Sequence, residues 1–178
     1  MAGSDPPGDE GECEDEDEGT AETGEAKPLL LDSMLGKLST YLRMCGYDAA
    51  YVLDDGPDPG DDAVLERARA AGRTLVTRDE RLAARADRSV LLASKSVGDQ
   101  LAEFAASGYS LKLGDRPTRC GSCNGTVVPV DADESVPDYA PDPGERPLWR
   151  CRDCGQVFWR GSHWADVAAR LDSVGREE

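Results

Sequence analysis

The stretch Leu29-Leu30-Leu31-Asp32-Ser33-Met34-Leu35-Gly36-Lys37-Leu38 decides the fold of this chain. Its three leucines predict a short buried strand, and the apolar residues from Met34 to Cys45 recur at the spacing of one helix face. Asp32 therefore stands at the carboxyl end of a strand, the edge of an open α/β sheet where ligands bind. This position makes it a candidate metal ligand or catalytic group. The competing interpretation is that Asp32 or Ser33 only caps the helix.

Strands and helices alternate as far as Gly108. We expect further strands at residues 49–53, 74–77 and 89–93, separated by helices that begin at Asp61, near Glu80 and before Val97. This alternation predicts an α/β fold with a parallel sheet covered by helices on both faces. Right-handed crossovers would place all strand carboxyl ends along one edge of that sheet.

Three aspartates are expected at that edge. Asp32 and Asp79 each follow a strand, and Asp61 opens a helix that begins there. Clustered carboxylates repel one another, so such a cluster predicts a bound divalent cation, and hard oxygen ligands suit Mg²⁺ or Mn²⁺. Such an ion activates water for phosphodiester hydrolysis. The alternative is that each acid is a local helix cap or a solvated charge.

The six cysteines include two pairs with the spacing of a metal site. Cys120-Gly-Ser-Cys123 and Cys151-Arg-Asp-Cys154 are separated by twenty-seven residues. Four thiolates, Cys120, Cys123, Cys151 and Cys154, would close a tetrahedral Zn²⁺ shell with no open position, which predicts a structural site. Gly125 and Gly155 follow the pairs and would relieve the tight turns. Free or redox-active thiols, or an iron centre, are the alternatives. The two single cysteines, Cys13 and Cys45, are expected to be inert.

The chain divides into three parts. Residues 1–27 hold eleven acidic residues and almost no large apolar side chain, which predicts a disordered tail. Residues 28–114 form the expected α/β domain. Residues 115–178 carry the cysteines, strands at 126–130 and 156–160, an acidic, proline-rich insertion at 131–147, and a closing amphipathic helix.

Composition narrows the class of protein. The net charge is -16, and only four of the twenty basic residues are lysines, as is typical of halophilic proteins, although a GC-rich genome would produce a similar bias. The chain has no apolar run of about 18 residues and no signal peptide, so we expect a cytoplasmic protein that does not cross a membrane. With His163 as the one histidine, a Ser/His/Asp triad has little support.

Several motifs together carry a resemblance to a known family. They are Leu30-Leu31-Asp32-x-Met34-Leu35-Gly36-Lys37-Leu38 with its continuation to Asp48, Leu75-Val76-Thr77-Arg78-Asp79, the cysteine pairs, and Trp159-Arg160-Gly161-Ser162-His163-Trp164. The chain resembles the Mut-seven C-terminal ribonuclease domain family, which is similar to PIN-type nucleases with an appended zinc ribbon.

The resemblance implies a PIN-like three-layer domain and a metal-dependent ribonuclease, with Asp32, Asp61 and Asp79 at the acidic positions. Asp62 adjoins Asp61 and could take its place. A fourth acid, which many PIN enzymes supply after the next strand, has no clear counterpart here.

RNA is the expected partner, and two basic residues, Lys37 and Arg78, are candidates to contact its phosphates. In the ribbon, Trp149, Phe158 and Trp159 could stack on bases or could form the ribbon core. The alternative functions are a non-catalytic RNA-binding or ribosome-associated zinc-ribbon module, and an adaptor whose ribbon docks on a protein. The oligomeric state cannot be predicted.

Overall fold

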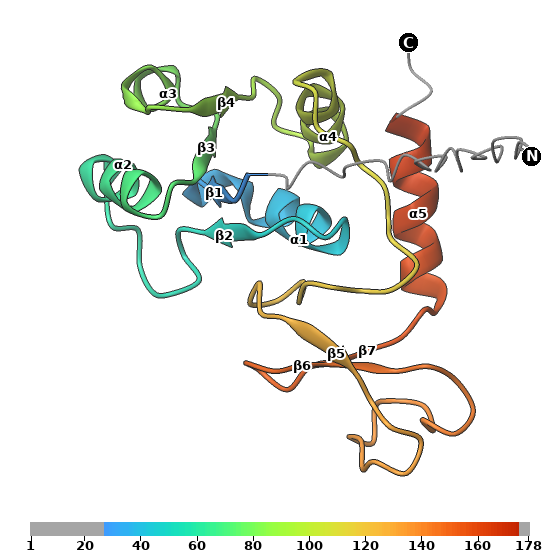
Figure 1. The fold of residues 1–178 in the computed structure, drawn as a ribbon. Helices are drawn as coiled ribbons and strands as arrows, with labels where there is room; N and C mark the ends of the chain where they lie inside the picture. The colour runs from blue at the N-terminus through green and yellow to red at the C-terminus, as the bar shows by residue number, and fades with distance from the viewer. Residues whose placement is uncertain (1–26, 175–178) are drawn as a thin grey trace, which may run out of the picture.

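The computed structural model describes residues 27–174, so the predicted acidic tail lies outside the described residues except for Lys27. Figure 1 shows an α/β body with a small sheet beside it. The elements are β1 (Leu29–Leu31), the 3-10 helix η1 (Ser33–Leu35), α1 (Gly36–Met44), β2 (Ala49–Tyr51), α2 (Asp61–Ala70), β3 (Thr74–Thr77), α3 (Glu80–Arg85), β4 (Ser89–Leu91), α4 (Val97–Ala106), β5 (Val127–Pro129), β6 (Trp149–Cys151), β7 (Val157–Phe158) and α5 (Ser162–Val174).

The first sheet has four parallel strands in the order β2-β1-β3-β4, which confirms the predicted α/β class. β1 lies inside the sheet between β2 and β3, and its three leucines have no solvent exposure. This burial explains why β1 is a continuous apolar run instead of an alternating one, since both of its faces are covered.

Alternate residues of the strands pack into two hydrophobic cores, one on each face of the sheet. Leu29 and Leu31 pack with apolar residues of α1, α4 and α5, whereas Leu30 packs with those of α2 and α3. Figure 1 shows these two groups of helices on opposite faces of the sheet. The sheet and its two helix layers make the expected three-layer body, which holds the strand ends in fixed positions.

Residues 115–160 build the second sheet, with three antiparallel strands in the order β5-β6-β7. It has a small core of its own around Trp149, Cys120 and Cys151. The insertion at 131–147 contains turns and no helix or strand. This unit is a zinc ribbon in architecture.

The last helix leaves the ribbon and returns to the α/β body. Val167 and Leu171 of α5 are buried in the same core as Leu101 and Phe104 of α4. The division of the chain at residue 115 stays a prediction, because the closing helix shares the core of the first part. No helix between residues 27 and 174 is both long and apolar enough to span a membrane.

Candidate functional site

The buried hydroxyl of Thr77 joins two of the predicted acidic positions at the carboxyl edge of the sheet. Thr77 Oγ1 donates to Asp32 Oδ2 at 2.6 Å and accepts from the backbone N–H of Asp79 at 3.0 Å. Thr77 is fully buried and Asp32 is 7% exposed. The topology thus brings Asp32 and Asp79 to one place, as the sequence predicts.

Both aspartates also act as helix caps. Asp32 Oδ1 accepts from the N–H of Ser33 at 2.7 Å, and Asp79 Oδ1 accepts from the N–H groups of Arg81 and Leu82 at 2.7 and 3.0 Å. Because a carboxylate offers about four lone-pair sites, these bonds leave acceptor sites for another ligand. Capping and cation binding are therefore compatible at both residues.

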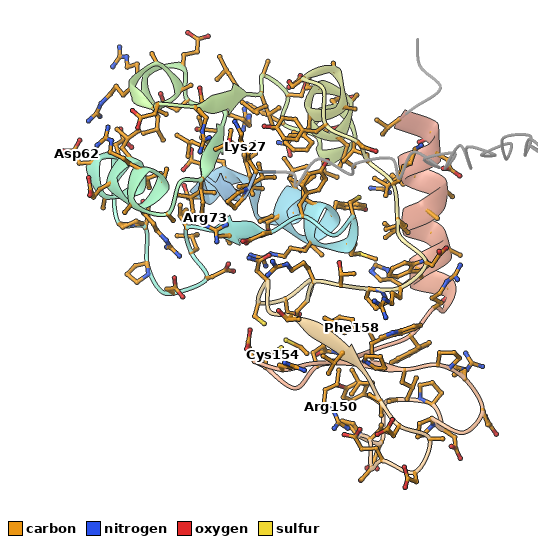
Figure 2. All side chains as sticks on the ribbon, viewed as in Figure 1. Lys27, Asp62, Arg73, Arg150, Cys154 and Phe158 are labelled. Carbon is orange, nitrogen blue, oxygen red and sulfur yellow. The ribbon has the colours of Figure 1, made fainter. Side chains whose placement is uncertain are left out.

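Asp61 differs from Asp32 and Asp79 in its surroundings. It is exposed in the first turn of α2, and the carboxylate of its neighbour Asp62 pairs with Arg85 of α3. Figure 2 places Asp62 on the outside of α2. Within residues 27–174, the four cysteines are the one set of three or more potential metal ligands with all ligand atoms inside 4.8 Å of one another. The three aspartates do not form such a set.

Arg78 brings a positive charge to the same edge. Its Nε is buried and has no hydrogen-bond partner within the described part of the chain, while Nη1 lies 4.0 Å from Met34 Sδ. A guanidinium with free donors beside carboxylates can receive a phosphate oxygen. Lys37, the other predicted phosphate contact, is exposed in the first turn of α1.

Glu103 adds a carboxylate to this edge that the sequence analysis does not single out. From α4 it reaches the turn after β4, where it accepts from Ser94 Oγ at 2.5 Å and from the N–H of Ala93 at 2.8 Å. The Ser94 hydroxyl has the largest effect and lowers the pKa of Glu103; burial opposes it, while the N–H groups of Ala93 and Ser94 and the charge of Arg78 add to the lowering. An acid that returns from the following helix leaves no signal in local spacing.

The four cysteines form the second candidate site. The Sγ atoms of Cys120 and Cys154 lie 3.6 Å apart, and those of Cys123 and Cys151 lie 3.5 Å apart. Sulfurs at about 2.3 Å from one zinc ion in a tetrahedron would be about 3.8 Å apart. The geometry fits a metal such as zinc.

The two cysteine turns are built alike. Cys120 C=O accepts from Asn124 N–H, and Cys151 C=O accepts from Gly155 N–H, at 2.9 and 3.1 Å. Asn124 and Gly155 both have positive φ, 66° and 74°. The sequence predicts the first of these roles for Gly125, and this prediction is wrong: Asn124 takes the left-handed conformation, which asparagine tolerates.

Gly125 is needed for a different reason. A Cβ there would lie 2.2 Å from Asp153 Oδ2 and 2.8 Å from Cys151 Sγ. The first turn therefore packs its backbone directly on the second.

The thiols differ in environment. Burial raises the pKa of Cys120 and of Cys123. At Cys151 burial acts in the same direction, but the N–H groups of Cys154 and Asp153 outweigh it, and the pKa is lowered. Burial also raises the pKa of Cys45, outside this site, to about 12, which agrees with the expected inert thiol.

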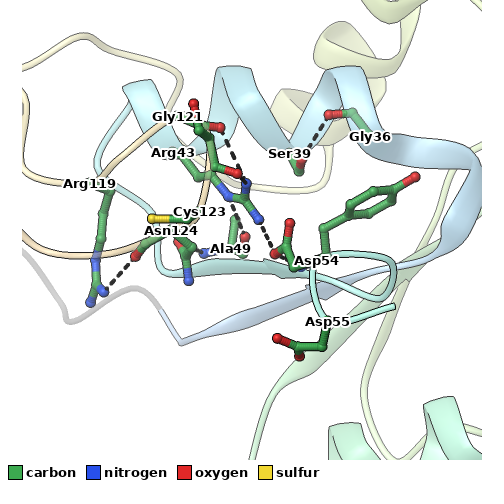
Figure 3. Close-up of polar contacts among 12 residues, drawn as sticks. Gly36, Ser39, Arg43, Ala49, Asp54, Asp55, Arg119, Gly121, Cys123 and Asn124 are labelled. Atoms are coloured by element: carbon green, nitrogen blue, oxygen red, sulfur yellow. Dashed lines mark hydrogen bonds and ion pairs between the residues drawn. The ribbon is translucent and has the colours of Figure 1, made fainter. Parts of the chain in front are cut away.

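The first cysteine turn is fastened to the α/β body by Arg43, as Figure 3 shows. Arg43 is 2% exposed, and it donates Nε to Ala49 C=O at 2.8 Å and Nη2 to Asp54 Oδ2 at 2.5 Å. Its Nη1 donates to the C=O groups of Gly121 and Ser122 at 3.2 and 3.1 Å. One buried guanidinium thus joins α1, β2 and the cysteine turn.

Asn124 makes a second connection between the same parts. Its Oδ1 accepts from the N–H of Ala49 at 3.0 Å, and its Nδ2 donates to Asp48 Oδ1 at 2.7 Å. Burial favours a raised pKa for Asp48, but its hydrogen bonds to Arg73 and Asn124 prevail and lower it. The ribbon is therefore docked on β2 by polar contacts.

Comparison with known proteins identifies the family. The family model described as the Mut7-C RNAse domain matches residues 27–171, which is most of the chain. The chain belongs to this family. The family description supports a nuclease-like role related to RNA, as the motifs around Asp32, Asp79 and the cysteines predict. No curated protein and no solved structure gives a significant match.

Proposed function

We propose that this protein is a divalent-metal-dependent ribonuclease that hydrolyses RNA phosphodiester bonds at the carboxyl edge of the first sheet. The observation that carries the proposal is the Thr77 hydroxyl, which holds the buried Asp32 carboxylate and the start of Asp79 together. Both acids lie at the same edge of the sheet, and carboxylates that share a site repel one another. A bound cation would offset that repulsion.

The residues fit a hard cation. Asp32, Asp79 and, from the start of α2, Asp61 would hold Mg²⁺ or Mn²⁺, which when bound would activate water and stabilise charge on the phosphate. Thr77 would fix the orientation of the Asp32 carboxylate through its 2.6 Å hydrogen bond. We assign Zn²⁺, held by Cys120, Cys123, Cys151 and Cys154, a structural role, since four thiolates leave no open position.

The cationic side chains at this edge would bind the substrate. Arg78 has a buried Nε without a partner in residues 27–174, and Lys37 stands exposed near the start of α1. The two side chains would contact phosphates of the RNA backbone and orient the phosphate that is cleaved. Such positioning raises the rate of hydrolysis.

A non-catalytic RNA-binding module is the second candidate. It is favoured by the observation that Asp32 and Asp79 already serve as helix caps and that the three aspartates do not meet as one compact ligand set. In that case the acids keep structural roles and RNA binding needs no cation.

Asparagine substitutions separate the two candidates. Asp79→Asn keeps the capping oxygen, so metal-free stability should change by less than about 1 kcal/mol. Asp32→Asn keeps the cap on Ser33 but removes the acceptor of the buried Thr77 hydroxyl, so it should cost about 1 kcal/mol more. Under the proposal both variants should lose Mn²⁺ binding in calorimetry and RNA cleavage by several orders of magnitude. Asp142→Asn, in the exposed insertion, is the matched control and should cleave like the parent. A parent protein that binds no divalent ion would remove the nuclease proposal and leave the binding module.

A further inference from the structure

A cleft of about 610 Å³ lies between the α/β body and the ribbon. α1 and Tyr51 line one side, and residues 156–159 and 161–164, from the ribbon and the start of α5, line the other, with Arg119, Gly121 and Tyr139 beside them. The docking contacts of Arg43 and Asn124 hold the two sides in place (Figure 3). The cleft is therefore a feature of the joined units and of neither alone.

Aromatic side chains are concentrated in this cleft. Of the ten aromatic residues in the chain, five line it: Tyr51, Tyr139, Phe158, Trp159 and Trp164. The ring pairs found within residues 27–174 all belong to Tyr47, Phe104 and Tyr109 in the α/β core, so the cleft rings do not stack on one another. Within the described residues, no second aromatic ring covers their faces.

The structure also divides the ribbon aromatics between two roles. Trp149 is 9% exposed in the ribbon core, whereas Trp159 faces the cleft and packs on Gly161, where a Cβ would come within 2.8 Å of its Nε1. The sequence alone leaves both roles open for these tryptophans. Gly161 leaves the space in which the Trp159 indole lies.

The charge of the cleft differs from that of the whole protein. The chain carries -16, yet Asp54 is the one acid among the residues that line the cleft, and Arg43 pairs with it. Arg119 and His163 line the same space. Of the acidic insertion, Tyr139 alone reaches the cleft, where its hydroxyl accepts from the N–H of Val157 at 3.0 Å. Such a lining does not repel a phosphate backbone.

One end of the cleft adjoins the carboxylate edge. Gly36, which lines the cleft, begins α1 directly after η1, and Asp32 caps η1. Tyr51 Oη donates to the C=O of Ser33 at 2.7 Å, and a Cβ on Gly36 would meet the Tyr51 ring at 3.1 Å. Burial raises the pKa of Tyr51, and the charge of Asp54 and, to a smaller extent, that of Asp32 add to this effect. Tyr51 therefore lies between the cleft and Asp32.

We propose that this cleft binds an unpaired segment of RNA, whose bases stack on Tyr139, Trp159 and Trp164 while the strand continues past Tyr51 toward Asp32. Its volume is that of a pocket for a small organic ligand, so it accommodates about one or two nucleotides and excludes a duplex. Stacking tolerates any base, which makes the substrate class single-stranded RNA without a strict sequence. The direction of the strand rests on the proposed function, but binding in the cleft does not.

Binding to labelled RNA tests the inference in the full-length, zinc-loaded protein without Mg²⁺ or Mn²⁺. The probes are a fluorescein-labelled ten-nucleotide poly-U strand and a blunt RNA hairpin, measured by anisotropy at one fixed salt concentration. Tyr139→Ala and Trp164→Ala should each weaken poly-U binding about tenfold, the loss of one stacked base. Tyr139→Phe keeps the ring and should bind like the parent. Arg88→Ala removes a positive charge just before β4, outside the cleft, and should also bind like the parent.

Three results would overturn the inference: unchanged poly-U binding by both alanine variants, equal binding of the hairpin, or a parent dimer that Tyr139→Ala dissociates, which would make the cleft an interface between copies. Because Tyr139 is 53% exposed, its variant tests the cleft even if Trp164→Ala fails to fold. If the parent cleaves no RNA with Mn²⁺ while Tyr139→Ala weakens poly-U binding, the nuclease would be refuted and the cleft kept. If the parent cleaves RNA with Mn²⁺ while Tyr139→Ala and Trp164→Ala both bind poly-U like the parent, the cleft would be refuted and the nuclease kept.

Discussion

Arg43→Met should destabilise the protein far more than an exposed arginine change of the same kind. Methionine replaces the aliphatic stem but removes the guanidinium from its contacts with Asp54, Ala49, Gly121 and Ser122. Removing one partner of a buried ion pair costs about 3–5 kcal/mol. The Asp54 side chain is 22% exposed to solvent, so the cost of breaking this ion pair should lie at the lower end of that range.

The carbonyl groups add a smaller cost. Gly121 and Ser122 are partly or fully exposed and can bind water instead, whereas Ala49 is fully buried and its C=O loses a partner at a cost of about 1 kcal/mol. The total is about 3–4 kcal/mol. For a chain of this size the melting temperature should fall by about 6–16 °C.

Arg67→Met is the matched control. Arg67 pairs with Asp55 at 2.5 Å, the same distance as in the Arg43 pair, but the two side chains are 34% and 74% exposed. A solvent-screened pair of this kind contributes about 0–1 kcal/mol. Thermal unfolding of the zinc-loaded proteins and hydrogen exchange of residues 121–124 would make the comparison. If Arg43→Met and Arg67→Met melted at the same temperature, the assigned role of Arg43 would be wrong.

Three further outcomes are expected. Cys151→Ser should contain no zinc in elemental analysis, and its hydrogen exchange should be faster in residues 115–160 while β1 and β3 stay protected. The reason is that a structural zinc contributes about 10 kcal/mol or more to the folding of such sites. Zinc retained at full stoichiometry would contradict this prediction. The lowered pKa of Asp48 means that its contribution to stability is present above its ordinary value of 3.8 and is lost as pH falls through the lower folded value; Asp48→Asn should therefore be less stable than the parent at pH 7, with a difference that shrinks at acid pH in denaturant titrations. Asp62→Asn removes the exposed partner of Arg85 and should leave RNA cleavage unchanged while Asp61→Asn reduces it; the reverse result would exchange their roles.

What the sequence predicts well is encoded within a few neighbouring residues. The leucines of β1 predict a strand that is buried on both faces, and the alternation of strands and helices predicts a parallel sheet. These two features place Asp32 and Asp79 at one edge of the sheet, where the structure has them. The cysteine spacing likewise predicts the sulfur cluster. In each case local patterning and general topology rules determine the position.

What the sequence does not predict depends on contacts between distant segments. In the sequence, Arg43 has the position of an ordinary polar residue on an amphipathic helix. Its partners Gly121 and Ser122 follow almost eighty residues later. Glu103 returns to the end of β4 from the next helix, and Asn124 replaces the expected glycine because its side chain also bonds to Ala49. Such pairings are set by how the ribbon docks, for which no local pattern exists.

That docking also explains how β2 can stand at the edge of the sheet without a neighbouring strand. Asn124 Oδ1 accepts from the N–H of Ala49, Arg43 donates to its C=O, and Asp54 Oδ2 accepts from the N–H of Tyr51. Side chains therefore satisfy backbone groups that would otherwise invite pairing with another chain. Because the same contacts set the width of the cleft, we expect loss of the first cysteine turn to expose the β2 edge and to open the cleft together. Zinc binding would in this way support RNA binding without contacting RNA.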